Sequence, residues 1–303
     1  MGRYRPRLSQ AHHTSVDTLG AIDRLEIEAG GFTFTGRACG PHEGRRVLLL
    51  HGFPQTSWAW RDELWALGRE GYRAIAPDQR GYCTGARPPA VDDYATELLL
   101  HDVIALADSM DMETFDLVGH DWGGMLAWIV ASRHPGRVRT LSVVSTPHPL
   151  ALHEALRGAD PRQAAYGESM DAFRAPDVPE RLLLGADGAG AGLATLLAET
   201  GLDDEDARMY VAALTEPGAL TAALNWYRAM NGSALTGLNP ICVPTLYVWS
   251  TGDEAFGWAA AQNTAECVQG PYTFEVLDNV SHWIPEMAPV ELSALLVRHL
   301  RAH

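Results

Sequence analysis

Short apolar runs alternate along this chain with longer segments whose apolar residues recur at helical spacing. Residues 23–40 alternate polar and apolar side chains around Gly30-Gly31, which predicts an antiparallel hairpin. Continuous apolar runs, typical of strands buried on both faces, follow at "RRVLLLHG", "YRAIAPD", "TFDLVGHD" and "VRTLSVVST". Helical patterns separate these runs at residues 58–70, 95–110 and 123–135. This β-α-β order predicts an α/β fold with a mostly parallel, doubly wound sheet.

The alternation stops after residue 150. Residues 151–237 contain only helical patterns and Gly, Pro or Asp breaks, whereas strand patterns resume at "VPTLYVWSTGD" and "YTFEVLDNVSH" and a helical pattern closes the chain. We therefore expect a core made of residues 21–150 and 238–303, with residues 151–237 inserted as a helical cap, or lid. Residues 1–20 are basic and polar without the apolar stretch of a signal peptide, which predicts a disordered tail.

Composition narrows the classes of function. The length of 303 residues suits one large α/β domain with an insertion, and a formal net charge of −15 disfavours nucleic acid and anionic membranes as partners. No apolar run is long enough to span a membrane. Four scattered cysteines without a C-x-x-C pair indicate a reducing cytoplasm. The 12 histidines have no metal-site spacing, so we expect no metal and no cofactor.

Polar residues at three strand ends suggest a catalytic site. "LVGHDWGGML" has the form of the nucleophile elbow G-x-S-x-G, but Asp121 stands where serine would be. Asp253 and His282 follow two later strands, and ligands of open α/β sheets bind at the carboxyl ends of strands. Singly, the two aspartates could be helix N-caps and His282 a surface histidine. Their order of nucleophile, acid and histidine along the chain favours a shared site.

The residue types then predict the chemistry. A carboxylate suits displacement of a leaving group at an sp3 carbon, which would leave an ester on Asp121. His282, oriented by Asp253, would activate water to attack the carbonyl carbon of that ester. The backbone N–H groups of Phe53 and Trp122 would stabilise the oxyanion. His51 and His120 flank the turns and are expected to hydrogen-bond backbone groups instead of taking part in the chemistry.

Five motifs together resemble those of soluble epoxide hydrolases of the α/β-hydrolase fold: "HGFPQTSWAWR", "DQRGYCTGARPP", "LVGHDWGGMLAW", "LNWYRAM" and "VSHWIPEMAP". The resemblance extends from about Arg46 to the C-terminus. The epoxide hydrolases use an aspartate nucleophile, and haloalkane dehalogenases are their close relatives. It implies that Tyr227 of "LNWYRAM" donates a proton to the epoxide oxygen. A phenol is protonated at neutral pH and can make this donation.

The chain departs from the family pattern at one position. By the resemblance, a second cap tyrosine would lie four residues before Phe173, but Ser169 is there. Tyr166 lies one helical turn earlier and can share a face with Ser169, so Tyr166, Ser169 or water remain alternatives for the second donor.

The resemblance also bears on the substrate. An apolar pocket including Trp122, Phe53, Ser169, Phe173 and Trp283 is expected to accept a neutral, hydrophobic epoxide, for example an aryl or polycyclic one, and water. Phe53 occupies the position where haloalkane dehalogenases often have asparagine, which favours the epoxide hydrolase. A haloalkane dehalogenase and a low-turnover ligand-binding protein of the same fold remain the alternatives, and the oligomeric state, including a homodimer, stays open.

Overall fold

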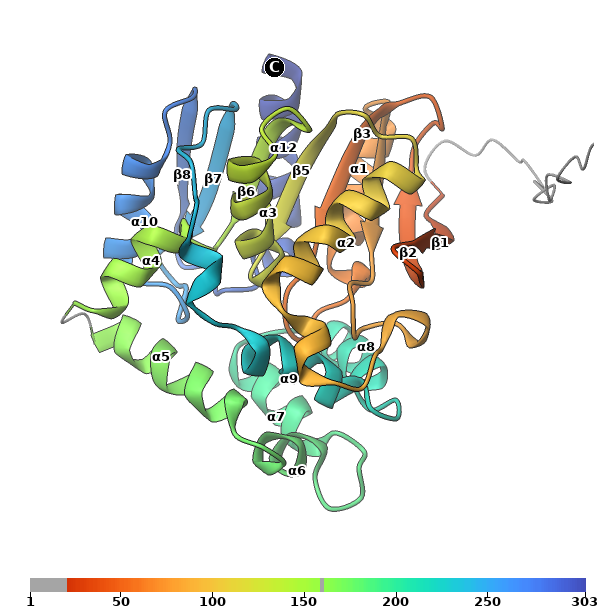
Figure 1. Cartoon of the computed structure of the whole chain (residues 1–303), viewed down its shortest axis with the longest axis vertical. Coiled ribbons are helices and arrows are strands. Elements are labelled where there is room, and N and C mark those ends of the chain that lie inside the picture. The colour runs from red at the N-terminus through yellow and green to blue at the C-terminus, as the bar shows by residue number, and fades with distance from the viewer. Residues whose placement is uncertain (1–20, 159–160) are drawn as a thin grey trace, which may run out of the picture.

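Eight strands form one sheet at the centre of the protein (Figure 1). A computed structural model describes residues 21–158 and 161–303, without the side chains of residues 161–166, 169, 233 and 234, so the predicted tail of residues 1–20 lies outside it. The strands are β1 (Asp23–Ala29), β2 (Phe32–Cys39), β3 (Arg45–Leu50), β4 (Tyr72–Pro77), β5 (Phe115–His120), β6 (Val138–Val144), β7 (Thr245–Ser250) and β8 (Tyr272–Leu277).

The strand order is β1-β2-β4-β3-β5-β6-β7-β8. β1 and β2 form the predicted antiparallel hairpin, β2 pairs antiparallel with β4, and the pairs from β4 to β8 are parallel. The prediction of a mostly parallel, doubly wound sheet is therefore confirmed. The parallel strands all point their carboxyl ends toward the same edge of the sheet, where the predicted site residues stand.

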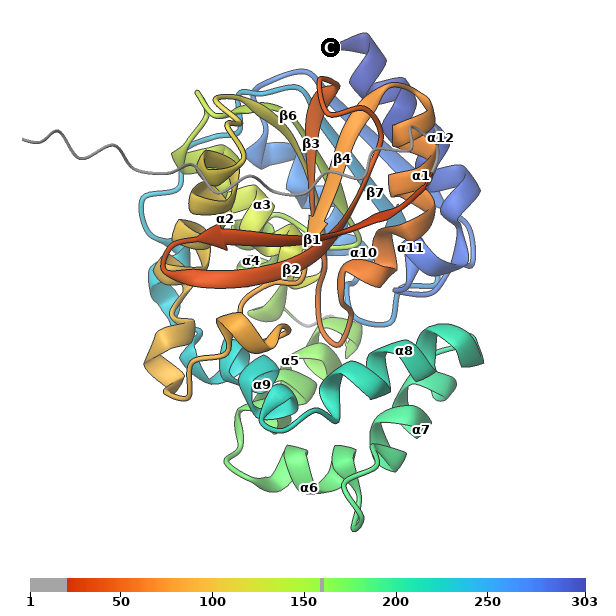
Figure 2. The ribbon, with the colours of Figure 1, turned by 90° about the vertical axis from the view of Figure 1, so that its right-hand side faces the viewer.

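Helices cover both faces of this sheet (Figures 1 and 2). α1 (Arg61–Arg69) and α12 (Pro289–Ala302) pack on one face, and α2 (Thr96–Ser109) and α3 (Trp122–Arg133) pack on the other. Successive strand residues alternate between the two faces, so Leu49 belongs to the apolar cluster on the α1 and α12 face and Leu48 to the cluster on the α2 and α3 face. Burial on both faces explains why these strands read as continuous apolar runs.

The helices between β6 and β7 lie together beyond one end of the sheet (Figures 1 and 2). They are α4 (Pro149–Leu156), α5 (Pro161–Arg174), α6 (Val178–Leu184), α7 (Ala191–Glu199), α8 (Asp204–Leu214), α9 (Ala219–Ala229) and the 3-10 turn η4 (Gly232–Leu235). We call this set the inserted helices. It begins at Pro149 instead of near residue 151, because the His148 ring caps α4 by accepting from Leu150 N.

The remaining elements are short. The predicted helix 58–70 divides into a 3-10 turn, η1 (Ser57–Trp60), and α1. The sequence patterns did not predict α10 (Trp258–Asn263) and α11 (Ile284–Met287), which are too short for a helical period to emerge. Three further 3-10 turns are η2 (Thr84–Ala86), η3 (Val91–Tyr94) and η5 (Thr264–Cys267). Each described helix is too short or too polar to cross a membrane.

Side-chain hydrogen bonds fasten the inserted helices to the core. The Trp226 indole on α9 donates to the backbone carbonyl of Arg80 at 2.9 Å, and the Arg80 guanidinium is itself held by a buried ion pair with Asp102 at 2.6 Å. The Trp58 indole donates to Asp206 on α8 at 2.6 Å. These contacts hold α8 and α9 against the core, and α9 carries Tyr227.

Candidate active site

The turn from β5 into α3 places Asp121 at the carboxyl end of a central strand. Asp121 has φ 50° and ψ −121°, a conformation that costs a non-glycine residue on the order of 1–3 kcal/mol. The neighbouring chain holds it there through close contacts that only glycine allows. A Cβ on Gly119 would lie 2.3 Å from the Gly123 carbonyl oxygen, and a Cβ on Gly123 would lie 2.1 Å from that of Leu50.

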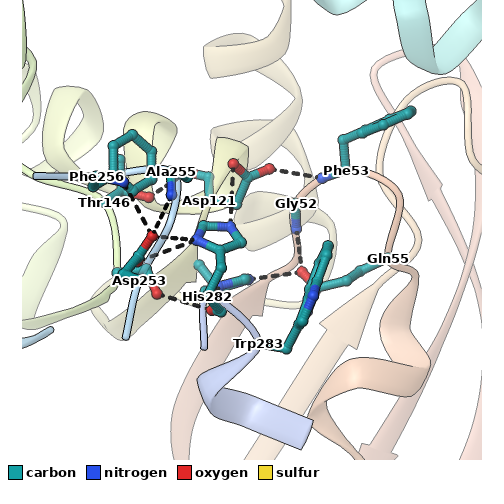
Figure 3. A network of polar contacts seen from close by, with 12 residues as sticks. Gly52, Phe53, Gln55, Asp121, Thr146, Asp253, Ala255, Phe256, His282 and Trp283 are labelled. Atoms are coloured by element: carbon teal, nitrogen blue, oxygen red, sulfur yellow. Dashed lines mark hydrogen bonds and ion pairs between the residues drawn. The ribbon is translucent and has the colours of Figure 1, made fainter. Parts of the chain in front are cut away.

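The Asp121 carboxylate lies between two groups (Figure 3). Phe53 N donates to Oδ1 at 2.8 Å, and His282 Nε2 lies 3.7 Å from Oδ2. Although Asp121 occupies the N-cap position of α3, its side chain makes no capping hydrogen bond. The cap alternative therefore does not account for this carboxylate, which is directed at the loop after β3 and at His282.

Asp253 orients the opposite side of the His282 ring. His282 Nδ1 lies 3.2 Å from Asp253 Oδ2 and 3.3 Å from Oδ1 (Figure 3). Asp253 Oδ1 also accepts the N–H groups of Ala255 and Phe256 at 2.8 and 3.0 Å. These bonds belong to the turn before α10, which begins only at Trp258, and they fix the carboxylate toward the ring. The structure thus brings all three predicted residues together.

Charge is distributed asymmetrically in this site. Burial lowers the pKa of His282, but the negative charge of Asp253 and hydrogen bonds with both carboxylates outweigh burial and raise that pKa to about 10. Burial acts to raise the pKa of Asp121, yet hydrogen bonding and charge from His282 lower it overall. The arrangement therefore holds an ionised Asp121 against a protonated imidazole at neutral pH.

The loop after β3 approaches the carboxylate very closely. A Cβ on Gly52 would lie 2.2 Å from Asp121 Oδ1, so glycine is required for Phe53 N to reach its acceptor. The Trp122 N–H is the first of α3, at the positive end of the helix dipole. Both predicted oxyanion donors thus belong to backbone that adjoins Asp121.

His51 and His120 hydrogen-bond away from the reacting carboxylate. His51 Nδ1 donates to the Gly52 carbonyl at 2.9 Å and its Nε2 accepts from Gln79 N at 3.1 Å, as expected of a backbone-bonding residue. The His120 ring lies 2.9 Å from the His282 carbonyl and, unexpectedly, 2.8 Å from the side chain of Gln55. Burial and the charge of His282 lower the pKa of His120 to about 3, so this ring is neutral.

Aromatic side chains gather beside Asp121. The buried Tyr227 ring lies 5.1 Å from Trp122, 5.1 Å from Phe173 and 5.5 Å from Phe53, between ring centroids. Trp283 instead donates from its indole to Thr200 Oγ1 at 2.8 Å.

Two predicted residues cannot be located at the level of side chains. Tyr166 and Ser169 both belong to α5, but their side chains lie outside the described part of the structure.

An apolar cavity of about 510 Å³ opens from Asp121 between α3 and the inserted helices α4 and α5. Among the predicted pocket residues, Trp122 lines it, whereas Phe53, Phe173 and Trp283 are not among its lining residues. Most of the remaining lining is aliphatic or thioether and was not predicted residue by residue: Met125, Leu126, Leu152, Leu156, Met170 and Leu235. A helical signal existed for Met125, which stands one turn after Asp121.

Sequence reasoning also missed polar residues that support the site. Thr146 Oγ1 donates to the Asp121 carbonyl at 2.9 Å, and Gln55 bonds to Gly52 N at 3.1 Å. Neither residue belongs to a recognisable catalytic pattern, although Gln55 lies within "HGFPQTSWAWR". Over the described residues, no cluster of three or more His, Cys, Asp or Glu side chains could hold a metal ion.

Comparisons with known proteins identify the family. Residues 45–289 match the family described as the alpha/beta hydrolase fold. The chain is 34% identical to an AB hydrolase superfamily protein of Bacillus subtilis, over 91% of this chain and 96% of that protein. It is 31% identical to epoxide hydrolase 3 of Xenopus tropicalis, over 97% of this chain and 82% of that protein, and 30% identical to epoxide hydrolase A of Mycobacterium tuberculosis, over 93% and 98%.

Solved structures give the same picture. Epoxide hydrolase A from Mycobacterium thermoresistibile superposes with a TM-score of 0.80 at 27% identity, covering 93% of this chain and 98% of that one. An epoxide hydrolase from Vigna radiata superposes with a TM-score of 0.81 at 25% identity, covering 94% and 100%.

Replacing Asp253 tests the electrostatic account. Asp253→Asn keeps the shape of the side chain but removes the negative charge that raises the pKa of His282, so we expect that pKa to fall by about two units. NMR titration of the His282 ring measures it. The exposed Asp278→Asn is the matched control, and an unchanged His282 pKa in Asp253→Asn would contradict the account.

Proposed function

This chain belongs to the α/β-hydrolase fold family, and from its relationship to the epoxide hydrolases of that family we propose that it converts a neutral, hydrophobic epoxide to a vicinal diol. One observation carries the proposal. A carboxylate, Asp121, stands at the elbow between the Phe53 N–H and His282, and it opens onto an apolar cavity. A carboxylate so placed can form an ester with a carbon electrophile.

In the first step, Asp121 attacks one carbon of the epoxide. The C–O bond to that carbon breaks, its electron pair moves to the epoxide oxygen, and an ester forms on Asp121. The lowered pKa of Asp121 supports this role because only the ionised carboxylate is a nucleophile. The oxygen takes a proton from a donor in the site.

Tyr227 is the donor that we assign to ring opening. Its ring adjoins Trp122 and Phe53, the two residues whose backbone N–H groups adjoin the nucleophile. Phe173 also packs against the Tyr227 ring, and the three ring contacts restrict its orientation. Tyr166, Ser169 or water supplies any second donor.

In the second step, water attacks the carbonyl carbon of the ester. His282 Nε2 accepts a proton from this water, and the Phe53 and Trp122 N–H groups stabilise the oxyanion. The tetrahedral intermediate then collapses: the bond from the carbonyl carbon to the substrate oxygen breaks, that oxygen takes the proton of the new Asp121 carboxyl group, and the diol leaves with Asp121 restored as a carboxylate and His282 as the imidazolium.

The charges explain why His282 becomes a base only after the first step. Formation of the ester neutralises Asp121, one of the two carboxylates that raise the pKa of His282. Burial then lowers the pKa of His282 further, the imidazolium gives its proton through solvent to the phenolate that Tyr227 has become, and the neutral ring can accept a proton from water.

The cavity and the insertion support the substrate class. The lining around Asp121 is mostly apolar, with Asp171 and Arg174 of α5 also among the lining residues, and it favours a neutral, hydrophobic substrate. The inserted helices would act as a cap that shields the ester from bulk water. The four cysteines are free, which supports a cytoplasmic location for the enzyme. No cofactor takes part in either step.

A haloalkane dehalogenase is the second candidate. The Trp122 side chain lines the cavity beside Asp121, where an indole N–H could bind a departing halide. The Phe53 side chain offers no donor for that halide, so we favour the epoxide.

A parallel assay distinguishes the two candidates. Diol formation from alkyl and aryl epoxides is measured beside halide release from matched haloalkanes. We expect the wild type to form diol and Asp121→Ala to lose at least about 10⁴-fold of that rate, because no nucleophile remains. Halide without diol would favour the dehalogenase, and diol formation by Asp121→Ala would exclude the ester route.

Removal of the base should expose the ester. In His282→Gln, the first step proceeds but water is not activated, so Asp121 stays alkylated. Intact mass spectrometry after incubation with an accepted epoxide should detect an adduct of substrate mass, which peptide mapping assigns to Asp121. His282→Gln combined with Asp121→Ala is the control, and absence of an adduct from the single variant would count against two steps.

Loss of the Tyr227 hydroxyl should affect the first step alone. We expect Tyr227→Phe to slow ester formation about 100-fold, because the epoxide oxygen loses its acid, with little change in ester hydrolysis. Quenched-flow mass spectrometry measures both steps. Tyr272→Phe is the matched control, since its hydroxyl has no described partner and it begins β8 at the far end of the sheet. Equal slowing of both steps in Tyr227→Phe would refute this role.

A further inference from the structure

Two hydrogen bonds from different parts of the fold meet on one oxygen of Glu286, on α11. Gln55 Nε2, in the loop after β3, donates to Glu286 Oε1 at 2.7 Å. The hydroxyl of Tyr210, on α8 of the inserted helices, donates to the same oxygen at 2.5 Å. Glu286 therefore joins the inserted helices to the loop that carries the proposed oxyanion donor.

The Gln55 amide passes this constraint to the backbone. Its Oε1 accepts from Gly52 N at 3.1 Å and lies 2.8 Å from His120 Nδ1. Gln55 is completely buried, so each end of its amide needs a partner within the protein. Glu286 accepts from the NH₂ end, and this fixes the carbonyl end toward Gly52.

Gly52 precedes the residue whose N–H reaches the nucleophile. Phe53 N donates to Asp121 Oδ1 at 2.8 Å, and Gly52 already lies at the limit of close approach to that carboxylate. A rotated Gln55 amide would release Gly52 N and change the direction of the Phe53 N–H. Stabilisation of an oxyanion depends steeply on the direction of its donors.

This role requires an acceptor atom and not a charge. Burial raises the pKa of Glu286 to about 7, so the carboxyl group is partly protonated at neutral pH. Oε2 has no hydrogen-bond partner in the described chain, and a proton there leaves Oε1 able to accept both bonds. The ionisable groups that face Glu286 are Tyr210 and Asp206 from α8 and the buried Glu63 from α1, with Arg61 paired to Asp206.

We propose that Glu286 is a positioning residue for ester hydrolysis, acting through Gln55 on the Phe53 N–H. The inference rests on the proposed function, because it assigns Glu286 to the second of its two steps. The Phe53 N–H matters most when the ester carbonyl becomes an oxyanion. Ester formation, which depends on Asp121 and the phenol, should be little affected.

This selectivity has a kinetic signature. When only the second step slows, kcat and KM fall together and kcat/KM, which reports ester formation, stays constant. A variant that merely loosened the fold would lower kcat/KM or the active fraction. The two explanations therefore predict different parameters.

The test compares Glu286→Leu with Glu286→Gln. We expect Glu286→Leu to lower kcat about tenfold, with kcat/KM within about twofold of the wild type and the ester accumulating by mass spectrometry. Glu286→Gln retains the accepting oxygen and should keep kcat within about threefold of the wild type. The exposed Glu291→Leu, on α12, controls for the same chemical change.

A second variant keeps the test decisive if Glu286→Leu does not fold. Gln55→Leu removes the next member of the chain and should give the same kinetic signature, and the double variant should be no slower than either single one. Equal losses in kcat and kcat/KM without ester accumulation would overturn the role of Glu286, as would additive effects. Failure of the wild type to form any ester would instead overturn the proposed function.

Discussion

The site depends above all on how closely the sheet and α3 approach each other around Asp121. Two glycines let the α3 backbone contact the ends of β3 and β5 at distances that no side chain would allow. This approach keeps a carboxylate in an unfavourable backbone conformation, at the tip of a turn and directed away from its own helix. The same packing brings the Gly52–Phe53 loop against the carboxylate, so no additional structural element is required to position the Phe53 N–H.

A single imidazole between two carboxylates then sets the state of charge. In the resting site the pair of carboxylates favours an imidazolium, which in turn favours an ionised nucleophile. Covalent chemistry at Asp121 would change the balance without any movement of the protein. The neighbouring His120, buried and neutral, adds no positive charge that would disturb this balance.

Much of this arrangement could be predicted from the sequence because it depends on patterns of neighbouring residues. Strand runs, the elbow motif and chain order were enough to bring Asp121, Asp253 and His282 to one edge of the sheet. The contact between Gln55 and Glu286 could not be predicted, since it joins residues 231 positions apart that have no motif in common. The residues that line the cavity could not be predicted either. Which faces of α4 and α5 contact the cavity depends on how the inserted helices pack, and a helical period in the sequence does not specify this packing.

The position of the insertion has a consequence for folding. Leu141 of β6 pairs with Thr245 of β7, which follows it only after the whole inserted segment. Until β7 is synthesised and paired, β6 is an apolar edge strand with unpaired backbone groups, and such edges template aggregation. Pairing β6 with β7 also closes a long loop, and the conformational entropy of that loop is lost before the strand contacts form. This makes the pairing a slow step. The segment that encloses the cavity is thus also the one that delays completion of the sheet.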